Sequence, residues 1–202
     1  MNGTIKIFTE QNSKMQNSEK QIIVDILRKS FQDNKSVNFV VKQDNKREVR
    51  INKLMEYSYF QGETFGKIYL SKDQNACAIV LIPSKKKTTL KSILWDLKLV
   101  FKCMGISNVS KVLKRESEIK KHHPDFPFLH LWYIGVNPEF QGKARGTELM
   151  ARIMHDAKEL NLPIYLETST PRNFPFYEKL GFKLISELDN LGYPLKMYLK
   201  DK

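Results

Sequence analysis

The second half of the chain alternates apolar runs with helical patterns, and this order constrains the fold more than any other feature. The run 128–136 is almost entirely apolar and aromatic, as expected of a central strand that is covered on both faces. A helical pattern over 144–160 and a second apolar run over 163–168 follow. Strands that alternate with helices at this spacing require a partly parallel sheet. We therefore predict an α/β fold, or α+β in the wider sense, built on a mixed sheet.

Patterns in the rest of the chain indicate further strands and helices. An antiparallel hairpin is expected from 66–70 and 76–82 around a polar turn, and three more strands at 4–8, 182–187 and 196–200. Apolar residues at helical spacing cover 18–31, 89–104, 110–121 and 171–180, and 47–60 also favours a helix. Residues 37–41 indicate a short strand or an extended link. Because no repeat or linker interrupts these elements, we expect one domain over 1–202.

The charge of the chain is concentrated in one segment. The chain has 202 residues, 41% of them hydrophobic, which is enough for a sizeable core and excludes wholesale disorder, collagen and a coiled-coil rod. The net charge is +12, and residues 84–121 hold eleven basic and three acidic residues, a net of +8. Such a segment suits nucleic acid, an anionic membrane surface or a phosphorylated small molecule. Without zinc-finger spacing or an aromatic RNA-binding pattern, nucleic acid is not expected, and 85–87 is expected to be a solvated turn.

Cysteine usage and hydropathy predict the compartment. The two cysteines, Cys77 and Cys103, form no CxxC pair and are expected to be reduced thiols. The first residues contain no apolar leader segment. The most apolar stretch, 90–104, carries four charges and is too short to span a bilayer. These features predict a cytoplasmic protein with no membrane partner.

A loop of small residues joins the predicted central strand to the next helix. Gly142, Ala144 and Gly146 allow a ligand to approach the backbone, and the first N–H groups of a helix have no helical partner. Together with the positive end of the helix dipole, such a terminus binds anions such as a pyrophosphate, and Lys143 and Arg145 add charge beside it. The alternative is a plain strand-to-helix turn whose small residues serve packing.

This loop resembles the acyl-CoA loop of the GNAT superfamily of N-acyltransferases. The family pattern is Gln/Arg-x-x-Gly-x-Gly/Ala, and Gln141, Ala144 and Gly146 fall on it, with Ala144 in place of the usual Gly. A second segment, 166–182, resembles the family's Asn-x-x-x-Tyr-x-x-x-Gly-Phe block. The residues of this segment are most similar to those of the puromycin N-acetyltransferase group. Both segments stand in the family's order and spacing, and the resemblance covers 128–182.

The resemblance implies a GNAT-like fold with a central mixed sheet, antiparallel N-terminal strands, a splayed parallel pair at the cofactor site and helices on both faces. It implies acetyl-CoA as the cosubstrate. No metal is expected, because the adjacent His122 and His123 point apart and no other ligand has a matching spacing. The residues expected to bind acetyl-CoA are Val136, Gln141, Gly142, Lys143, Ala144, Arg145, Gly146, Thr147 and Asn173.

Acyl transfer to an amine needs a polarised carbonyl, a neutral amine and a protonated leaving thiolate. The resemblance implies that the backbone N–H of Val136 polarises the thioester. It also implies that Tyr177 protonates the departing sulfur, a step that suits a phenol with a pKa of about 10. The alternative for Tyr177 is an ordinary core tyrosine.

Two residues are candidates for the general base. His130 lies on the central strand, where alternation places it on one face with Trp132 and Ile134, and its imidazole can accept a proton from an ammonium group through water. Glu167 ends an apolar strand, where ligands of open α/β sheets usually bind. The alternatives are a packed histidine and a salt bridge from Glu167 to Arg172 or Lys179.

We therefore expect an N-acetyltransferase that moves the acetyl group of acetyl-CoA to the primary amine of a small molecule by direct attack in a ternary complex. The helical segment 84–124 is expected to line the acceptor pocket, with Trp95, Phe101 and Met104 as lining residues or plain core. The alternatives are a protein or peptide N-acetyltransferase and a GNAT-like binding protein that uses its basic face. The expected partner is the amine, and a homodimer is left open.

Overall fold

The computed structural model describes residues 17–202, so the strand predicted over 4–8 lies outside the described residues. Its centre is a six-stranded mixed sheet in the order β1-β2-β3-β4-β6-β5. The strands are β1 (Gly66–Leu70), β2 (Ala76–Leu81), β3 (Leu129–Val136), β4 (Ile164–Thr168), β5 (Lys183–Leu188) and β6 (Leu195–Lys200). Within this sheet β3 and β4 pair in parallel and the other neighbours pair antiparallel. The predicted hairpin, central strand and closing strands are confirmed.

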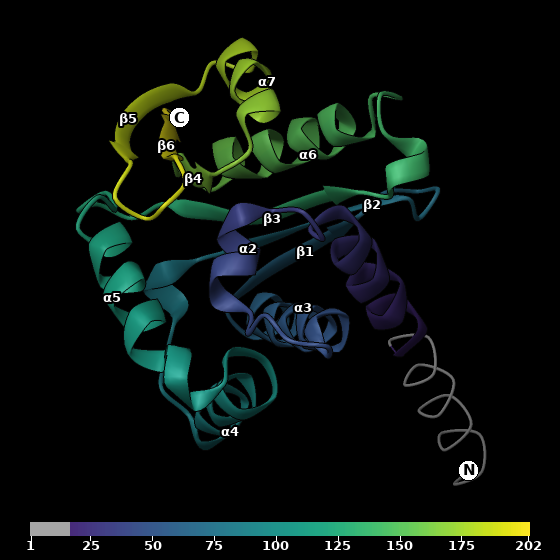
Figure 1. Ribbon diagram of the computed structural model, residues 1–202. Coiled ribbons are helices and arrows are strands. Elements are labelled where there is room, and N and C mark those ends of the chain that lie inside the picture. The colour runs from purple at the N-terminus through teal and green to yellow at the C-terminus, as the bar shows by residue number, and fades with distance from the viewer. Residues whose placement is uncertain (1–16) are drawn as a thin grey trace, which may run out of the picture.

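Helices cover both faces of the sheet (Figure 1). One face carries α6 (Arg145–Glu159) and α7 (Phe174–Lys179); the other carries the helix over 17–30, α2 (Lys35–Val40) and α3 (Arg47–Phe65). Each face has its own core, because α6 buries Leu149, Met150 and Ile153 against the sheet while α3 buries Ile51 and Met55 on the other side. Strand β2 lies between the two layers, which explains why nearly all of its residues are apolar and buried.

The segment between β2 and β3 is helical, as predicted. It contains η1 (Pro83–Lys85), α4 (Leu90–Leu99), the π-helical turn η2 (Val100–Met104), η3 (Ile106–Asn108) and α5 (Val109–Lys120). Thr89 and Ser92 form a capping box at the start of α4, and Gly105, with φ of 74°, ends the run after the π-turn. Two further short turns, η4 (Pro138–Phe140) and η5 (Pro171–Asn173), precede α6 and α7. No helix among residues 17–202 is long and apolar enough to cross a bilayer.

The prediction of a strand or extended link over 37–41 is wrong, because this stretch is helical as α2. The side chain of Asn34 accepts a hydrogen bond from the backbone N–H of Val37 and so caps the helix. The β-branched residues suggested an extended chain, but Val37 and Val41 are buried against the core formed with α3. Tertiary burial outweighs local β-propensity here.

A β-bulge in β3 changes which side chains share a face. In the pairing with β2, Tyr133 lies opposite Ile79 and Leu131 opposite Val80, so Trp132 is the extra residue. The prediction that His130, Trp132 and Ile134 lie on one face is therefore wrong beyond the bulge. Ile134 packs with Leu131 in the core beneath α6, whereas Trp132 and Tyr133 pack in the core on the α3 side.

Candidate active site

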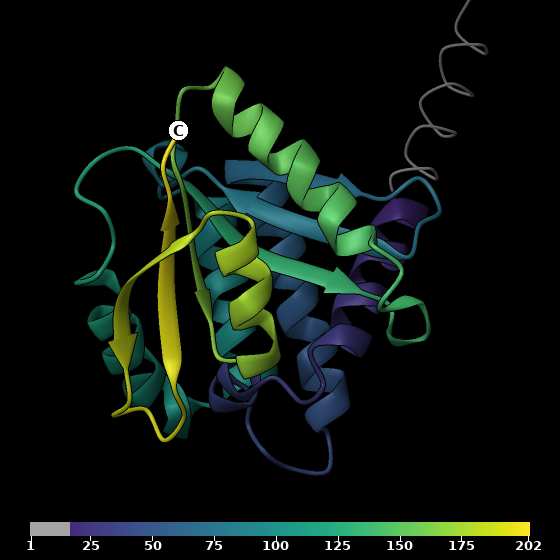
Figure 2. The same ribbon diagram turned by 90° about the horizontal axis from the view of Figure 1, so that it is seen from above.

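The parallel pair β3–β4 separates soon after it begins. Only two residue pairs are in register, Leu129 with Ile164 and His130 with Tyr165. Beyond them β3 runs on to Val136 along β2, while β4 turns away beside β6. Figure 2 shows the two strands diverging with α7 above the wedge between them. The expected splayed pair is present, and beyond His130 no strand within residues 17–202 pairs with β3 on the β4 side.

A cavity of about 1480 Å³ follows this wedge. It extends from the start of α6 past the ends of β3 and β4 to α3 and α5. Every predicted site residue except Lys143 lines it, which brings together the proposed catalytic and cofactor-binding groups. The ammonium of Lys143 instead lies over the ring of Phe140, 5.0 Å from its centroid.

The first turn of α6 is uncapped. Among residues 17–202, no side chain forms a cap hydrogen bond there, and the first backbone bond of the helix runs from Glu148 N–H to the Ala144 carbonyl. A Cβ added at Gly142 would meet nothing within 4 Å, and one at Gly146 would make only ordinary contacts at 3.9 Å. Packing therefore does not require either glycine, but the backbone does favour glycine at 142, which has the left-handed φ of 75°. The open space beside both positions leaves room for a ligand at the helix terminus, as the anion-binding interpretation requires.

Ala144 adopts the left-handed conformation, with φ of 58° and ψ of 5°. This position is the one where the family pattern has glycine. The left-handed conformation costs a residue with a Cβ about 1–2 kcal/mol of free energy, whereas glycine adopts it without this cost. The chain therefore keeps the backbone shape of a glycine loop in spite of the substitution.

Arg145 does not offer the free positive charge expected beside the loop. Its Nε forms an ion pair with the carboxylate of Asp73 in the β1–β2 turn, and its guanidinium lies over the ring of Phe140. The hydroxyl of Ser71 and the Arg145 guanidinium together hold the pKa of Asp73 well below its usual value. Arg145 thus fastens the loop to the hairpin.

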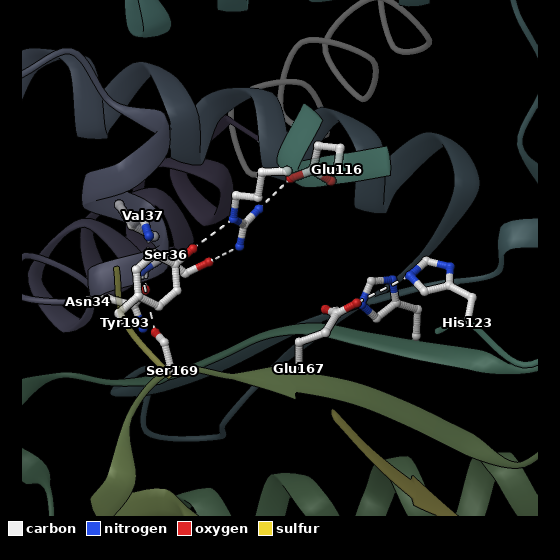
Figure 3. A network of polar contacts seen from close by, with 10 residues as sticks. Asn34, Ser36, Val37, Glu116, His123, Glu167, Ser169 and Tyr193 are labelled. Carbon is white, nitrogen blue, oxygen red and sulfur yellow. Dashed lines mark hydrogen bonds and ion pairs between the residues drawn. The ribbon is translucent and has the colours of Figure 1, made fainter. Parts of the chain in front are cut away.

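On the β4 side of the wedge, Glu167 is held by two histidines (Figure 3). Its Oε2 lies 2.9 Å from Nε2 of His130, and its Oε1 lies 3.3 Å from Nε2 of His123. The predicted salt bridge to Arg172 or Lys179 is wrong. A carboxylate can only accept hydrogen bonds, so both rings donate through Nε2 and the basic nitrogen of a neutral His130 is Nδ1.

The two histidines also control the charge of Glu167. Its side chain is 14% exposed, and burial by itself raises the pKa of a carboxyl group. The charge and hydrogen bonds of His130 and His123 outweigh burial and hold the pKa of Glu167 well below its usual value. The carboxylate is therefore a buried anion at neutral pH.

His123 and Tyr165 are site residues that the sequence did not reveal. His123 and its neighbour do point apart as predicted, since His122 Nδ1 lies 2.8 Å from Ser186 Oγ while His123 reaches Glu167. Tyr165 packs edge-on against the His123 and His130 rings. Its hydroxyl is buried near Glu167 with no hydrogen-bond partner among the described residues, and burial raises its pKa. Strand alternation with Glu167 could have indicated Tyr165, whereas no local pattern indicates His123.

Arg115 forms a second polar cluster in the wall of the same cavity (Figure 3). Its guanidinium is buried and donates to the Tyr193 hydroxyl at 2.7 Å, to Ser36 and to Glu116. These bonds join α5 to α2 and to the turn between β5 and β6. A buried arginine with several partners is costly to remove, so this cluster fixes the position of α5 beside the site.

Tyr177 lies on α7 with its ring against Phe182 and Tyr198. Only 4% of the residue is exposed, burial raises its pKa, and it borders the cavity.

Of the predicted lining residues in 84–124, Met104 borders the cavity, Trp95 stacks on Phe60, and Phe101 faces outward. No cluster of three or more His, Cys, Asp or Glu side chains within residues 17–202 is arranged to hold a metal ion.

The lowered pKa of Glu167 predicts a pH-dependent contribution to stability. A carboxyl group with a lower pKa in the folded than in the unfolded chain stabilises the fold above the unfolded value, here 4.5, and loses this effect as the pH falls below it. The difference in unfolding free energy between the wild type and Glu167→Gln should therefore shrink between pH 6 and pH 3. Urea unfolding across this range measures it, with exposed Glu139→Gln as the control for loss of one charge. A difference that stays constant with pH would contradict the assignment.

Part of the chain matches a known protein family. Residues 113–182 match the model of the Acetyltransferase (GNAT) family. An uncharacterized N-acetyltransferase of Schizosaccharomyces pombe is 31% identical over 90 residues, which are 43% of this chain. The match spans 36% of the length of that curated relative.

Two solved structures resemble nearly the whole chain. A Corynebacterium glutamicum structure described as histone acetyltransferase HPA2 and related acetyltransferase has a TM-score of 0.65 at 17% identity, over 91% of both chains. Arylalkylamine N-acetyltransferase 2 of Aedes aegypti has a TM-score of 0.65 at 14% identity, over 92% of this chain and 95% of its own. At these identities the likeness concerns the fold. This chain therefore has the fold of the GNAT acetyltransferases and carries that family's sequence pattern over residues 113–182.

Proposed function

We propose that this protein is an acetyl-CoA-dependent N-acetyltransferase that acts on the primary amine of a small molecule. The observation that carries the proposal is one cavity with an uncapped helix terminus at one end and a buried carboxylate–histidine pair at the other. The first can hold an anionic cosubstrate and the second a cationic acceptor. The resemblance to the puromycin N-acetyltransferase group stays a prediction that agrees with a small acceptor.

The residues around the α6 terminus fit acetyl-CoA. The free N–H groups of 145–147 and the open space at Gly142 suit a pyrophosphate, which would take up the unused donors of the helix. Gln141 and Asn173 border the same part of the cavity. When bound, acetyl-CoA supplies the activated acetyl group as a thioester. The backbone of Val136, at the free edge of β3, is the proposed donor to its carbonyl oxygen.

Glu167 and His130 are proposed to act as a pair on the amine. The buried carboxylate attracts the ammonium group and fixes the His130 ring through Nε2, so that Nδ1 can accept the proton, directly or through water. The two residues then act together, whereas the sequence analysis gave them as alternative candidates for the general base. Tyr177, whose raised pKa keeps its phenol protonated, is proposed to give a proton to the leaving sulfur.

Direct attack of the amine is the proposed route. The chain has two cysteines, both of them buried, and burial raises the pKa of Cys103 to about 12 and that of Cys77 further. Neither is a thiolate at neutral pH, so neither is suited to carry the acetyl group. A ternary complex remains the simplest arrangement.

The wall formed by the segment 84–124 favours a small acceptor over a peptide. Leu99, Val112 and Glu116 close the cavity on the side opposite α6, and the Arg115 cluster ties this wall to the body. A peptide amine is the second candidate, and a binding protein that uses the basic face is the third. A small acceptor that fits within the cavity would bind without any movement of α4 and α5.

The overall proposal predicts acetyl-CoA binding and CoA release with small amines. Calorimetry should show that Gly146→Asp abolishes binding, because it adds bulk and a like charge at the helix terminus. Gly146→Ala should still bind, since its Cβ makes only ordinary contacts. A panel of small primary amines and free peptides, assayed by CoA release, then tests the acceptor. Unchanged binding by the aspartate variant would contradict the cosubstrate site, and a preference for peptides would contradict the acceptor class.

The carboxylate–histidine pair predicts losses that do not add. His130→Ala and Glu167→Gln should each lower kcat/KM by about 10²- to 10⁴-fold, as loss of a general base does. Because the two side chains share one hydrogen bond, the double variant should lose little more than the worse single variant. His155→Ala, on the exposed side of α6, is the control. Losses that multiply in the double variant would show that the residues act independently.

The proposed acid predicts a defect in turnover and not in binding. Tyr177→Phe should lower kcat by about 10²- to 10⁴-fold while the affinity for acetyl-CoA stays the same. Tyr198→Phe is the matched control, because Tyr198 is an equally buried tyrosine whose ring neighbours Tyr177 but does not border the cavity. Wild-type turnover in Tyr177→Phe would mean that the tyrosine only packs.

A further inference from the structure

We propose that the outer face of α4 is a docking surface for an anionic lipid bilayer. Four large apolar side chains of α4 stand exposed on it, and Phe101 of the following turn η2 adds a fifth. We call these five residues the α4 stripe: Leu90, Ile93, Leu94, Leu97 and Phe101. Leu90 is 83% exposed, Leu94 58% and Phe101 59%. Scattered exposed apolar residues are ordinary, but five within the twelve residues 90–101 of one helical run form a patch that marks an interaction site.

The spacing of the stripe places it on a single side of the helix. At 3.6 residues per turn, the four α4 positions i, i+3, i+4 and i+7 fall within about 100° of one another. Phe101 follows in η2 and is 59% exposed. The opposite side holds α4 to the body: Ser92 and Cys103 are buried, and Trp95 stacks on Phe60 with ring centroids 4.9 Å apart. The helix is therefore anchored by one face and presents the other to solvent.

The stripe is separate from the candidate active site. None of its five residues borders the cavity, although Asp96, Leu99 and Val100 of the same helical run do. In Figure 1, α4 lies at the outer edge of the molecule, on the far side of α3 and α5 from the sheet. A flat surface could therefore approach the stripe without covering the wedge between β3 and β4.

Lysines follow the stripe. Lys91, Lys98 and Lys102 are exposed along one edge of it by the same helical spacing, and 85–87 add three more just before α4. The single acidic residue in 84–104 is Asp96, and its carboxylate accepts a hydrogen bond from the Tyr57 hydroxyl at 2.7 Å. An apolar stripe with a basic edge is the arrangement by which a helix lies in the headgroup region of an anionic membrane.

This charge pattern decides against a second copy of the chain as the occupant. In a two-fold symmetric contact, the same lysines would face one another across the interface and repel. The stripe also lacks a groove, since its residues protrude from the helix and border no cavity. Protruding Leu, Ile and Phe side chains suit insertion into fluid acyl chains. The sequence expectation of no membrane partner rested on the lack of a spanning segment, which a surface-bound helix does not need.

Flotation with lipid vesicles tests the proposal on the full chain. The wild type should bind vesicles of phosphatidylglycerol and phosphatidylcholine, should not bind phosphatidylcholine alone, and should be released by high salt. The double substitution Leu94→Ser and Phe101→Ser should weaken binding by about tenfold or more, because each side chain loses its apolar burial. Lys91, Lys98 and Lys102 changed together to Glu should remove the preference for the anionic vesicles.

The matched control is Leu184→Ser with Ile185→Ser, which removes two comparably exposed apolar side chains from β5. This variant should bind the vesicles as the wild type does, and thermal unfolding should show that all variants fold. Failure of the wild type to bind anionic vesicles would overturn the proposal. So would equal losses in the stripe and control variants, or a dimer in sedimentation that dissociates when the stripe is substituted. An acidic protein partner would be indicated by wild-type binding to polyglutamate with no binding to vesicles, which would also overturn it.

Discussion

The short parallel contact between β3 and β4 is the constraint on which the rest of the site depends. Two residue pairs hold the strands together, and beyond them β3 continues along β2 while β4 follows β6. The wedge opens between the last residues of β4 and an edge of β3 that no strand in the described part of the chain covers. The start of α6 follows β3 after the turn η4 and a short loop, and its first residues line the cavity at the wedge.

The buried charges of the wedge depend on contributions from distant parts of the chain. A carboxylate such as Glu167 is stable in a buried position only when donors surround it, and the donors are His130 from the neighbouring strand and His123 from the end of the α5 segment. Arg115 on the same helix is tied to Ser36 and Tyr193, which holds α5 in place. The segment between β2 and β3 is therefore part of the site's electrostatic framework as well as its wall.

That segment has two faces with opposite environments. Its inner side closes the cavity through Leu99, Val112 and Glu116, whereas the outer side of α4 exposes an apolar stripe beside lysines. Part of the basic excess noted in the sequence, Lys91, Lys98 and Lys102, thus lies at a surface away from the proposed chemistry, whereas Lys86, Arg115 and Lys120 line the cavity. The two proposals are compatible, because a bilayer at the α4 stripe would not cover the wedge.

The sequence by itself determined the elements whose evidence is local. The periodicities of β2, β3, α6 and the hairpin were sufficient because each buries a regular face, and the loop before α6 was recognisable because a helix terminus needs little more than small residues at fixed spacing. The left-handed backbone of Ala144 agrees with the glycine of the family pattern, so even this departure keeps the shape that the pattern predicts.

The tertiary structure decided the rest, because it depends on contacts between residues far apart in sequence. The residues 37–41 look extended, yet burial and the Asn34 cap make them helical as α2. The bulge at Trp132 arises from the register with β2 and reverses the faces that alternation predicts. Glu167 finds its partners 37 and 44 residues away, and Arg145 finds Asp73 72 residues away. Periodicity reports which face of an element is buried, but only packing in three dimensions determines which charged groups meet there.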